Sequence, residues 1–96
     1  MRNRGYRKGR KGMKAKIREI LAKHGGLPVN VDQITDDADL YATGMSSFAS
    51  VQIMLAIEEA FDVEFPDNLL NRKSFQSVTA IANTVDDLLG TAEAAE

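Results

Sequence analysis

Apolar residues return every three or four positions in three stretches of the chain, which is the spacing of one face of an α-helix. The first stretch predicts a helix over residues 13–24, from the spacing of Met13, Ile17, Ile20, Leu21 and His24. The last stretch predicts a helix over residues 78–89, from the spacing of Val78, Ile81, Val85, Leu88 and Leu89. Glycines follow both stretches, at Gly25-Gly26 and Gly90, and glycine commonly marks a helix C-terminus.

The middle stretch predicts a helix over residues 47–61 with Ser46 as its N-cap. At about 100° per residue, its apolar side chains fall into two groups on different sides of the helix. One group is expected to face the core and comprises Ile53, Met54, Ile57 and Phe61. The other comprises Phe48, Val51 and Leu55. A single buried stripe needs only one group, so the second either packs under a neighbouring segment or forms an apolar surface for a partner or cargo.

The segments between these helices carry turn and breaker residues. Residues 26–45 form a long, partly acidic loop. Phe65-Pro66 interrupts the helical pattern, because proline disfavours helical geometry in the residue before it. Residues 68–73 predict a short helical turn, and no segment alternates like a strand. The sequence therefore predicts an all-α fold: a small bundle of three main helices plus one short helix, with a long loop between helices 1 and 2.

Charge divides the chain unevenly. Residues 1–24 hold ten of the 12 Lys and Arg residues but only one of the 14 acidic residues. We expect residues 1–12 to be a disordered basic N-terminal arm, residues 13–90 the helical domain, and residues 91–96 a flexible C-terminal tail. A nucleic-acid or membrane-surface role for the arm is one interpretation. A solvated extension is favoured, because charge alone is weakly specific, so no stable nucleic-acid binding is expected.

The inventory of reactive side chains argues against an enzyme. The chain has no Cys and one His, so thiol chemistry and a cysteine or multi-histidine metal site are excluded. Glu58 and Glu59 are neighbours in a helix and do not face each other, so they would not clamp one substrate. No apolar run could span a membrane, and no signal-peptide core follows the basic start. We expect a cytoplasmic protein that acts as a monomer.

Two serines, Ser46 and Ser47, stand where the middle helix begins, after the loop residues Gly44 and Met45. Backbone N–H groups at a helix N-terminus lack intrahelical partners, and the helix dipole is positive there. A phosphate ester on one of these hydroxyls would lie in a favourable field. The alternative is that both serines only cap the helix.

The order of these features resembles the acyl carrier proteins, and more broadly the phosphopantetheine-carrying domains, over residues 14–89. The resemblance rests on Gly44, Phe48, Val51, the segment Ile57-Glu58-Glu59-Ala60-Phe61, the segment Val63-Glu64-Phe65-Pro66-Asp67, Asp37, Asp39, Leu40, Phe75, Ser77 and Val78. It implies that a phosphopantetheinyl transferase attaches 4'-phosphopantetheine to a serine. It also implies that acyl groups are held on this arm as thioesters and presented to acyl-loading and acyl-transferring enzymes.

The resemblance also selects the serine. Members of the family carry the group on the serine of an Asp-Ser-Leu motif, with Val four residues later. Counting back from Val51 selects Ser47, which leaves Ser46 in the Asp position and Phe48 in the Leu position. By resemblance, the acyl groove and the partner surface would comprise Met45, Phe48, Val51, Leu55, Ile57, Glu58, Glu59 and Leu69.

The sequence departs from the family's pattern around this serine. Ser46, Ala49 and Gln52 make the start of the helix neutral, where partner enzymes of the family usually meet acidic side chains. We therefore predict a specialised carrier of a dedicated lipid or secondary-metabolite pathway, whose partners contact Phe48 and its neighbours. The alternatives are an unmodified helical protein-interaction module and a nucleic-acid-binding protein that acts through the basic arm.

Overall fold

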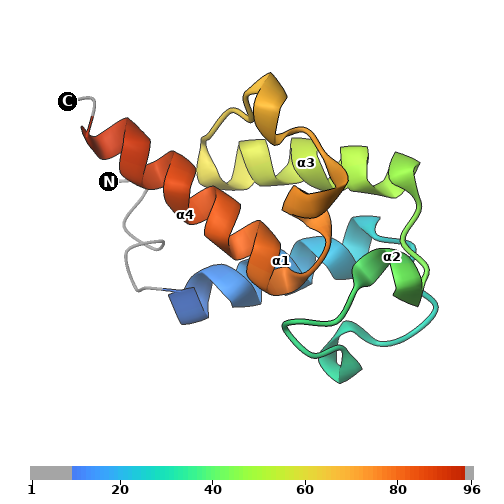
Figure 1. The fold of residues 1–96 in the computed structure, drawn as a ribbon. Coiled ribbons are helices and arrows are strands. Elements are labelled where there is room, and N and C mark those ends of the chain that lie inside the picture. The colour runs from blue at the N-terminus through green and yellow to red at the C-terminus, as the bar shows by residue number, and fades with distance from the viewer. Residues whose placement is uncertain (1–9, 95–96) are drawn as a thin grey trace.

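Helices make up the regular structure of residues 10–94, which are the residues that the computed structural model describes. The α-helices are α1 (Arg10–His24), α2 (Leu40–Thr43), α3 (Ser47–Phe61) and α4 (Val78–Ala94) (Figure 1). Three short 3₁₀-helices lie between them: η2 (Val31–Gln33), η3 (Asp67–Leu69) and η4 (Arg72–Phe75). No residue from 10 to 94 lies in a strand, which confirms the predicted all-α class.

The core forms where α1 packs against both α3 and α4, and α4 lies oblique to the other two helices (Figure 1). Each of these helices buries most of the stripe that its spacing predicts, because burying one apolar face is what stabilises a short amphipathic helix. His24, the last residue of the first predicted stripe, is exposed, and Leu88 and Leu89 are half-buried. The side chains with almost no exposed surface include Met13, Ile17, Leu21, Ile53, Ile57, Phe61, Val78, Ile81 and Val85. Met54, also predicted for the core, is only half-buried.

Two helix boundaries differ from the predicted ones. Helix α1 begins at Arg10, so residues 10–12 of the predicted basic arm are helical, and residues 1–9 lie outside the described residues. Helix α4 continues through Gly90 to Ala94, so the predicted tail is helical over residues 91–94. A glycine within a helix costs only about 1 kcal/mol, and the alanines and glutamate beyond Gly90 favour helix. The predicted stop at Gly90 was therefore wrong.

The long connection from α1 to α3 is tied to the bundle through Asp36. Its carboxylate accepts hydrogen bonds from Lys14 (3.2 Å) and Arg18 (2.5 Å) of α1. Arg18 also donates to the carbonyl oxygen of Val31 (2.6 Å), and the carbonyl oxygen of Asp36 accepts from the N–H of Thr79 in α4 (3.0 Å). The loop is thus fastened to two helices, which holds the segment that leads into α3.

The Asp36 ion pairs predict a pH dependence of stability. Hydrogen bonds from Arg18 and then Lys14 hold the pKa of Asp36 below its usual value. Its contribution is therefore complete above the unfolded-state pKa of about 3.9 and is lost as pH falls through the lower folded-state pKa. Because 40% of the side chain remains exposed, Asp36→Asn is expected to cost only about 1 kcal/mol at pH 7.

Thermal unfolding between pH 7 and pH 3 measures this effect. The difference in Tm between the wild type and Asp36→Asn should shrink as pH falls below about 4. The exposed neighbour Asp37 provides a control of equal charge change, and Asp37→Asn should leave the Tm nearly unchanged. A difference between wild type and Asp36→Asn that stays constant down to pH 3 would contradict the role of these ion pairs.

Candidate functional site

The two serines at the start of α3 have different surroundings. Ser46 has extended backbone angles (φ −84°, ψ 164°), and its Oγ accepts a hydrogen bond from the N–H of Ala49 (3.0 Å), so it is the N-cap that the sequence predicts. Ser47 is the first residue of the helix and is exposed. No side-chain hydrogen bond of residues 10–94 uses the Ser47 hydroxyl, whereas its carbonyl oxygen accepts from Ser50 Oγ (2.7 Å).

A tight turn places these serines. Gly44 has a φ of 133°, a conformation that residues with a Cβ rarely adopt. A Cβ at this position would also lie 2.9 Å from Cδ of Pro28. Glycine is therefore required here for both reasons, and it lets the chain pass directly from α2 into the start of α3. Met45, which follows it, turns inward and is only 3% exposed.

Asp39 fixes the short helix α2 beside this turn. One carboxylate oxygen accepts from the N–H groups of Tyr41 (2.9 Å) and Ala42 (3.2 Å), and the other accepts from Nε2 of Gln76 (3.3 Å). The N–H of Leu40 also donates to the carbonyl oxygen of Gln76 (2.7 Å). The hydrogen bond from Ala42, more than any other contact, keeps the pKa of Asp39 below its usual value. These contacts hold α2 against the segment that connects η4 with α4.

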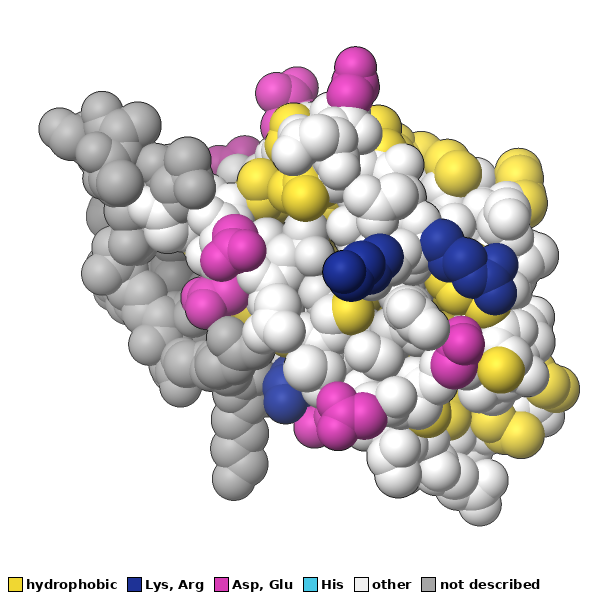
Figure 2. Space-filling view, in the orientation of Figure 1, with side chains coloured by type: hydrophobic (Ala, Val, Ile, Leu, Met, Phe, Trp, Pro, Cys, Tyr) yellow, Lys and Arg dark blue, Asp and Glu magenta, His cyan; other side chains and the backbone are white. Residues whose placement is uncertain are grey.

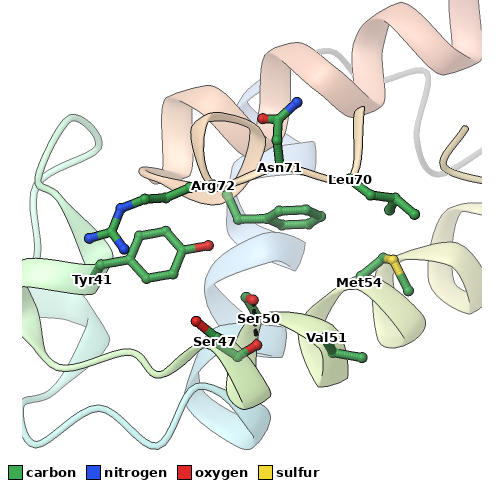
Figure 3. Close-up of a pocket in the computed structure, with 9 residues that line it drawn as sticks. Tyr41, Ser47, Ser50, Val51, Met54, Leu70, Asn71 and Arg72 are labelled. Atoms are coloured by element: carbon green, nitrogen blue, oxygen red, sulfur yellow. Dashed lines mark hydrogen bonds between the residues drawn. The ribbon is translucent and has the colours of Figure 1, made fainter. Parts of the chain in front are cut away.

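A groove of about 330 Å³ opens beside Ser47, between the first half of α3 and the segment that contains η4 (Figure 3). Its walls come from three separate parts of the chain: α2, α3 and residues 70–75. Carbon-rich side chains form most of the lining, and hydroxyl, amide and guanidinium groups are added by the remaining members. The lining residues are Tyr41, Ser47, Ser50, Val51, Met54, Leu70, Asn71, Arg72 and Phe75.

Aromatic contacts order the far wall of this groove. The guanidinium carbon of Arg72 lies 4.1 Å from the centroid of the Tyr41 ring, which is a cation–π contact. Phe75 stacks on Phe65, with ring centroids 5.3 Å apart. Asn71 accepts from the N–H of Ser74 (3.0 Å) and so caps η4. The wall is therefore held by local contacts and does not depend on an occupant of the groove.

An apolar surface lies beside the groove on α3. Phe48 is 73% exposed, Val51 47% and Leu55 50%, and we call these three residues the α3 apolar patch. In Figure 2, hydrophobic side chains stand exposed at the upper right, over the end of the molecule where α3 begins in Figure 1. The second apolar group of the helix is thus not covered by a neighbouring segment. Of the two predicted outcomes for this group, the structure shows the exposed surface.

Several residues predicted for the acyl groove or partner surface lie elsewhere. Ile57 is fully buried among the core side chains, because it shares the face of Ile53 and Phe61. Leu69 packs partly buried against the core, and its neighbour Leu70 lines the groove in its place.

Met45, Glu58 and Glu59 do not line the groove either. Met45 is buried, because Gly44 turns the chain inward. Glu58 accepts from the N–H of Phe65 (2.9 Å), which fastens the end of α3 to the proline turn, and Glu59 is exposed. Only Ser47 and Val51 of the predicted site residues line the groove itself.

The groove also contains residues that the sequence analysis did not assign to a groove or site, although Met54 was predicted for the core and Phe75 was part of the family resemblance. These are Tyr41, Ser50, Met54, Leu70, Asn71, Arg72 and Phe75. One signal was available for Arg72, because Arg72 and Lys73 are the only basic residues after residue 24 in an otherwise acidic domain. Nothing in the spacing of the others marked them, since they meet only in the folded chain.

The sequence of the helical domain matches a known protein family. The family model described as "Phosphopantetheine attachment site" matches residues 15–90, almost the whole helical domain. The chain belongs to this family. Its prosthetic group is 4'-phosphopantetheine, and the chain is a carrier protein and not an enzyme.

Individual relatives in the family are close. The aminoacyl carrier protein of Agrobacterium fabrum is 70% identical over 83 residues, which are 86% of this chain and 100% of the relative. A carrier protein from Agrobacterium tumefaciens has been crystallised with an engineered Bradyrhizobium japonicum glycine:[carrier protein] ligase and AMP. That structure matches with a TM-score of 0.76 and 73% identity, and the match covers 77% of this chain and 99% of that one. A solution structure from Agrobacterium tumefaciens matches with a TM-score of 0.69 and 70% identity, over 85% and 99%.

The described residues hold no other recognisable centre. No group of three or more His, Asp or Glu side chains within them could hold a metal ion. None of their helices is both long enough and apolar enough to cross a membrane.

Proposed function

We propose that this chain is an aminoacyl carrier protein whose 4'-phosphopantetheine arm is attached to Ser47. The observation that carries the proposal is the 70% identity to an aminoacyl carrier protein over that relative's entire length. The arm would supply a terminal thiol that holds an aminoacyl group as a thioester. The arm would be installed by a phosphopantetheinyl transferase, as the family resemblance implies.

The surroundings of the two serines favour Ser47 as the attachment residue. Ser46 Oγ is engaged in the N-cap, so esterifying it would sacrifice a contact worth about 1 kcal/mol. The hydroxyl group of Ser47 makes no capping hydrogen bond, and Ser47 is exposed and lines the groove. A phosphodiester on Ser47 would also lie at the positive end of the dipole of α3. The residues present therefore fit the group that the family carries.

The relatives support an amino acid as cargo, which narrows the sequence-based prediction of an acyl group from a lipid or secondary-metabolite pathway. The Agrobacterium fabrum relative is named an aminoacyl carrier protein, and the Agrobacterium tumefaciens carrier was crystallised with a glycine ligase. The groove does not favour a long alkyl chain, because Arg72, Asn71, Ser47 and Ser50 interrupt its apolar lining. A long alkyl chain would have to desolvate these groups.

The α3 apolar patch is the proposed docking surface for the loading enzyme, an amino acid:[carrier protein] ligase. The first turn of α3 contains no acidic residue, so a docking mode based on acidic side chains is not available there. Phe48 is the most exposed large hydrophobic side chain in the described chain and follows Ser47 directly. Large aromatic side chains at the centre of an interface commonly supply most of its binding energy.

Loading by a glycine:[carrier protein] ligase tests cargo and docking together. The holo protein is incubated with ATP and equal amounts of glycine and a fatty acid, and its intact mass is measured. Only the glycyl adduct is expected. Phe48→Ala is expected to lower loading efficiency about tenfold, equivalent to about 1.4 kcal/mol, with no change in Tm.

A matched control removes an exposed apolar side chain from another surface. Val29 is 42% exposed in the long loop, and Val29→Ala should load like the wild type. Failure of the ligase to load any amino acid would overturn the proposed cargo. Equal loading of Phe48→Ala and the wild type would overturn the proposed docking surface.

A further inference from the structure

Arg72 is the one charged residue that lines the groove beside Ser47. The other lining residues are neutral: aromatic, aliphatic, hydroxyl-bearing or amide-bearing. Arg72 is exposed, and its planar guanidinium group can donate parallel hydrogen bonds to a phosphate or carboxylate group. The groove therefore has a positive site at its edge and an apolar interior.

The Arg72 guanidinium is held in place but not neutralised by an ion pair. Its carbon lies over the Tyr41 ring at 4.1 Å, and no carboxylate between residues 10 and 94 forms a salt bridge with it. The charge of Arg72 contributes a little to the lowered pKa of Asp39, but the oxygens of Asp39 already accept from two backbone N–H groups and from Gln76. The ring contact uses none of the guanidinium N–H donors, and no hydrogen bond between residues 10 and 94 engages them.

We propose that Arg72, held over Tyr41, binds the phosphodiester that joins Ser47 to the arm, and that the groove then holds the arm against the protein between encounters with partners. The inference rests on the proposed attachment at Ser47. A phosphodiester keeps one negative charge across the physiological pH range, and arginine can donate two parallel hydrogen bonds to it. The opposite charges of the phosphodiester and Arg72 therefore favour the phosphopantetheine arm as the occupant of the groove.

The chemistry of the arm fits the mixed lining of the groove. Beyond the phosphate, pantetheine has a gem-dimethyl carbon, a hydroxyl group and two amides. Val51, Met54 and Phe75 offer apolar contact for the first of these. The Tyr41 hydroxyl points toward the groove in Figure 3 and can donate to an amide carbonyl.

The position of Arg72 also orients the cargo. The α-ammonium group of an aminoacyl thioester is repelled by a guanidinium, so the loaded end is expected to lie away from Arg72, with the phosphate drawn toward it. The phosphate end would be fixed while the thioester end stays near the open side of the groove. A docked ligase would need to release only the weakly held end.

³¹P NMR of the holo protein, combined with ¹H–¹⁵N spectra of the arginine side chains, tests the inference. The Arg72 Nε–Hε resonance is expected to shift between the apo and holo forms. The ³¹P resonance of the holo protein is expected to move in Arg72→Gln. Lys73→Gln is the matched control, because it removes the same charge from an exposed neighbouring residue that does not line the groove.

The outcomes separate this inference from the proposed function. Intact mass and peptide mapping first establish whether phosphopantetheine is on Ser47, and its absence there overturns both. If the arm is on Ser47 but the ³¹P resonance is the same in the wild type and Arg72→Gln, the role of Arg72 is wrong. Equal shifts in Arg72→Gln and Lys73→Gln would likewise contradict a specific contact. Arg72→Lys keeps the charge but lacks the planar guanidinium group. Its ³¹P resonance is therefore expected to lie between those of the wild type and Arg72→Gln.

Discussion

Replacing Ser47 with alanine is expected to abolish phosphopantetheine attachment, so the protein stays entirely in its apo mass after incubation with coenzyme A and a phosphopantetheinyl transferase. The substitution removes the only atom that the proposed ester bond can use. The fold should be unaffected, because Ser47 is exposed and its hydroxyl makes no hydrogen bond within residues 10–94. Intact mass measurement shows the outcome directly, and circular dichroism confirms that the variant is folded.

Ser46→Ala is the matched control for this result. It removes a hydroxyl from the adjacent residue and loses the hydrogen bond to the N–H of Ala49. The expected cost is about 1 kcal/mol in the free energy of unfolding, with complete modification retained. The reverse pattern, in which Ser46→Ala blocks attachment and Ser47→Ala does not, would show that the serines have been assigned the wrong way round.

Replacing Ile57 with alanine is expected to give the largest loss of stability among the predicted site residues. Ile57 is fully buried, so the variant loses transfer free energy and leaves a cavity in a tightly packed core. The expected cost is about 2–5 kcal/mol, which for a domain of this size lowers the Tm by roughly 10 °C or more. Thermal or urea unfolding of the apo protein measures it.

Leu55→Ala provides the comparison on the same helix. Leu55 is 50% exposed on the α3 apolar patch, so its loss should change the free energy of unfolding by about 0.5 kcal/mol or less. Its effect should appear in ligase docking instead. Similar losses of stability in Ile57→Ala and Leu55→Ala would contradict the separation of the two apolar faces of α3.

The helical framework could be predicted from local sequence because each main helix carries a clear stripe and local end signals. The bounds of α3 and the N-cap role of Ser46 are as predicted, since capping depends on residues only three positions apart. The end of α4 was missed because Gly90 sits in open space, where nothing but its own small penalty opposes the helix. A steric clash with another part of the fold, or a proline after Gly90, would have ended α4 there.

The groove could be predicted only in part. Ser47 and Val51 share one helix, so their spacing revealed them. The opposite wall depends on hydrogen bonds between α2 and the segment after η4, such as Leu40 N–H to Gln76, which no periodicity encodes. Leu69 was predicted for the groove, but Leu70 lines it instead. The 3₁₀-helices η3 and η4 are too short for a spacing of apolar residues to show which side chain faces the groove.

Tandem mass spectrometry of the holo protein, after loading by a glycine:[carrier protein] ligase with ATP, is the most direct test of an aminoacyl thioester on Ser47. The predicted result is a peptide containing Ser47 that carries phosphopantetheine plus one amino acid. Mild hydroxylamine treatment should release the amino acid and leave the arm in place, as expected for a thioester. An amino acid attached to any other residue, or an arm that accepts a fatty acyl group and no amino acid, would contradict this account.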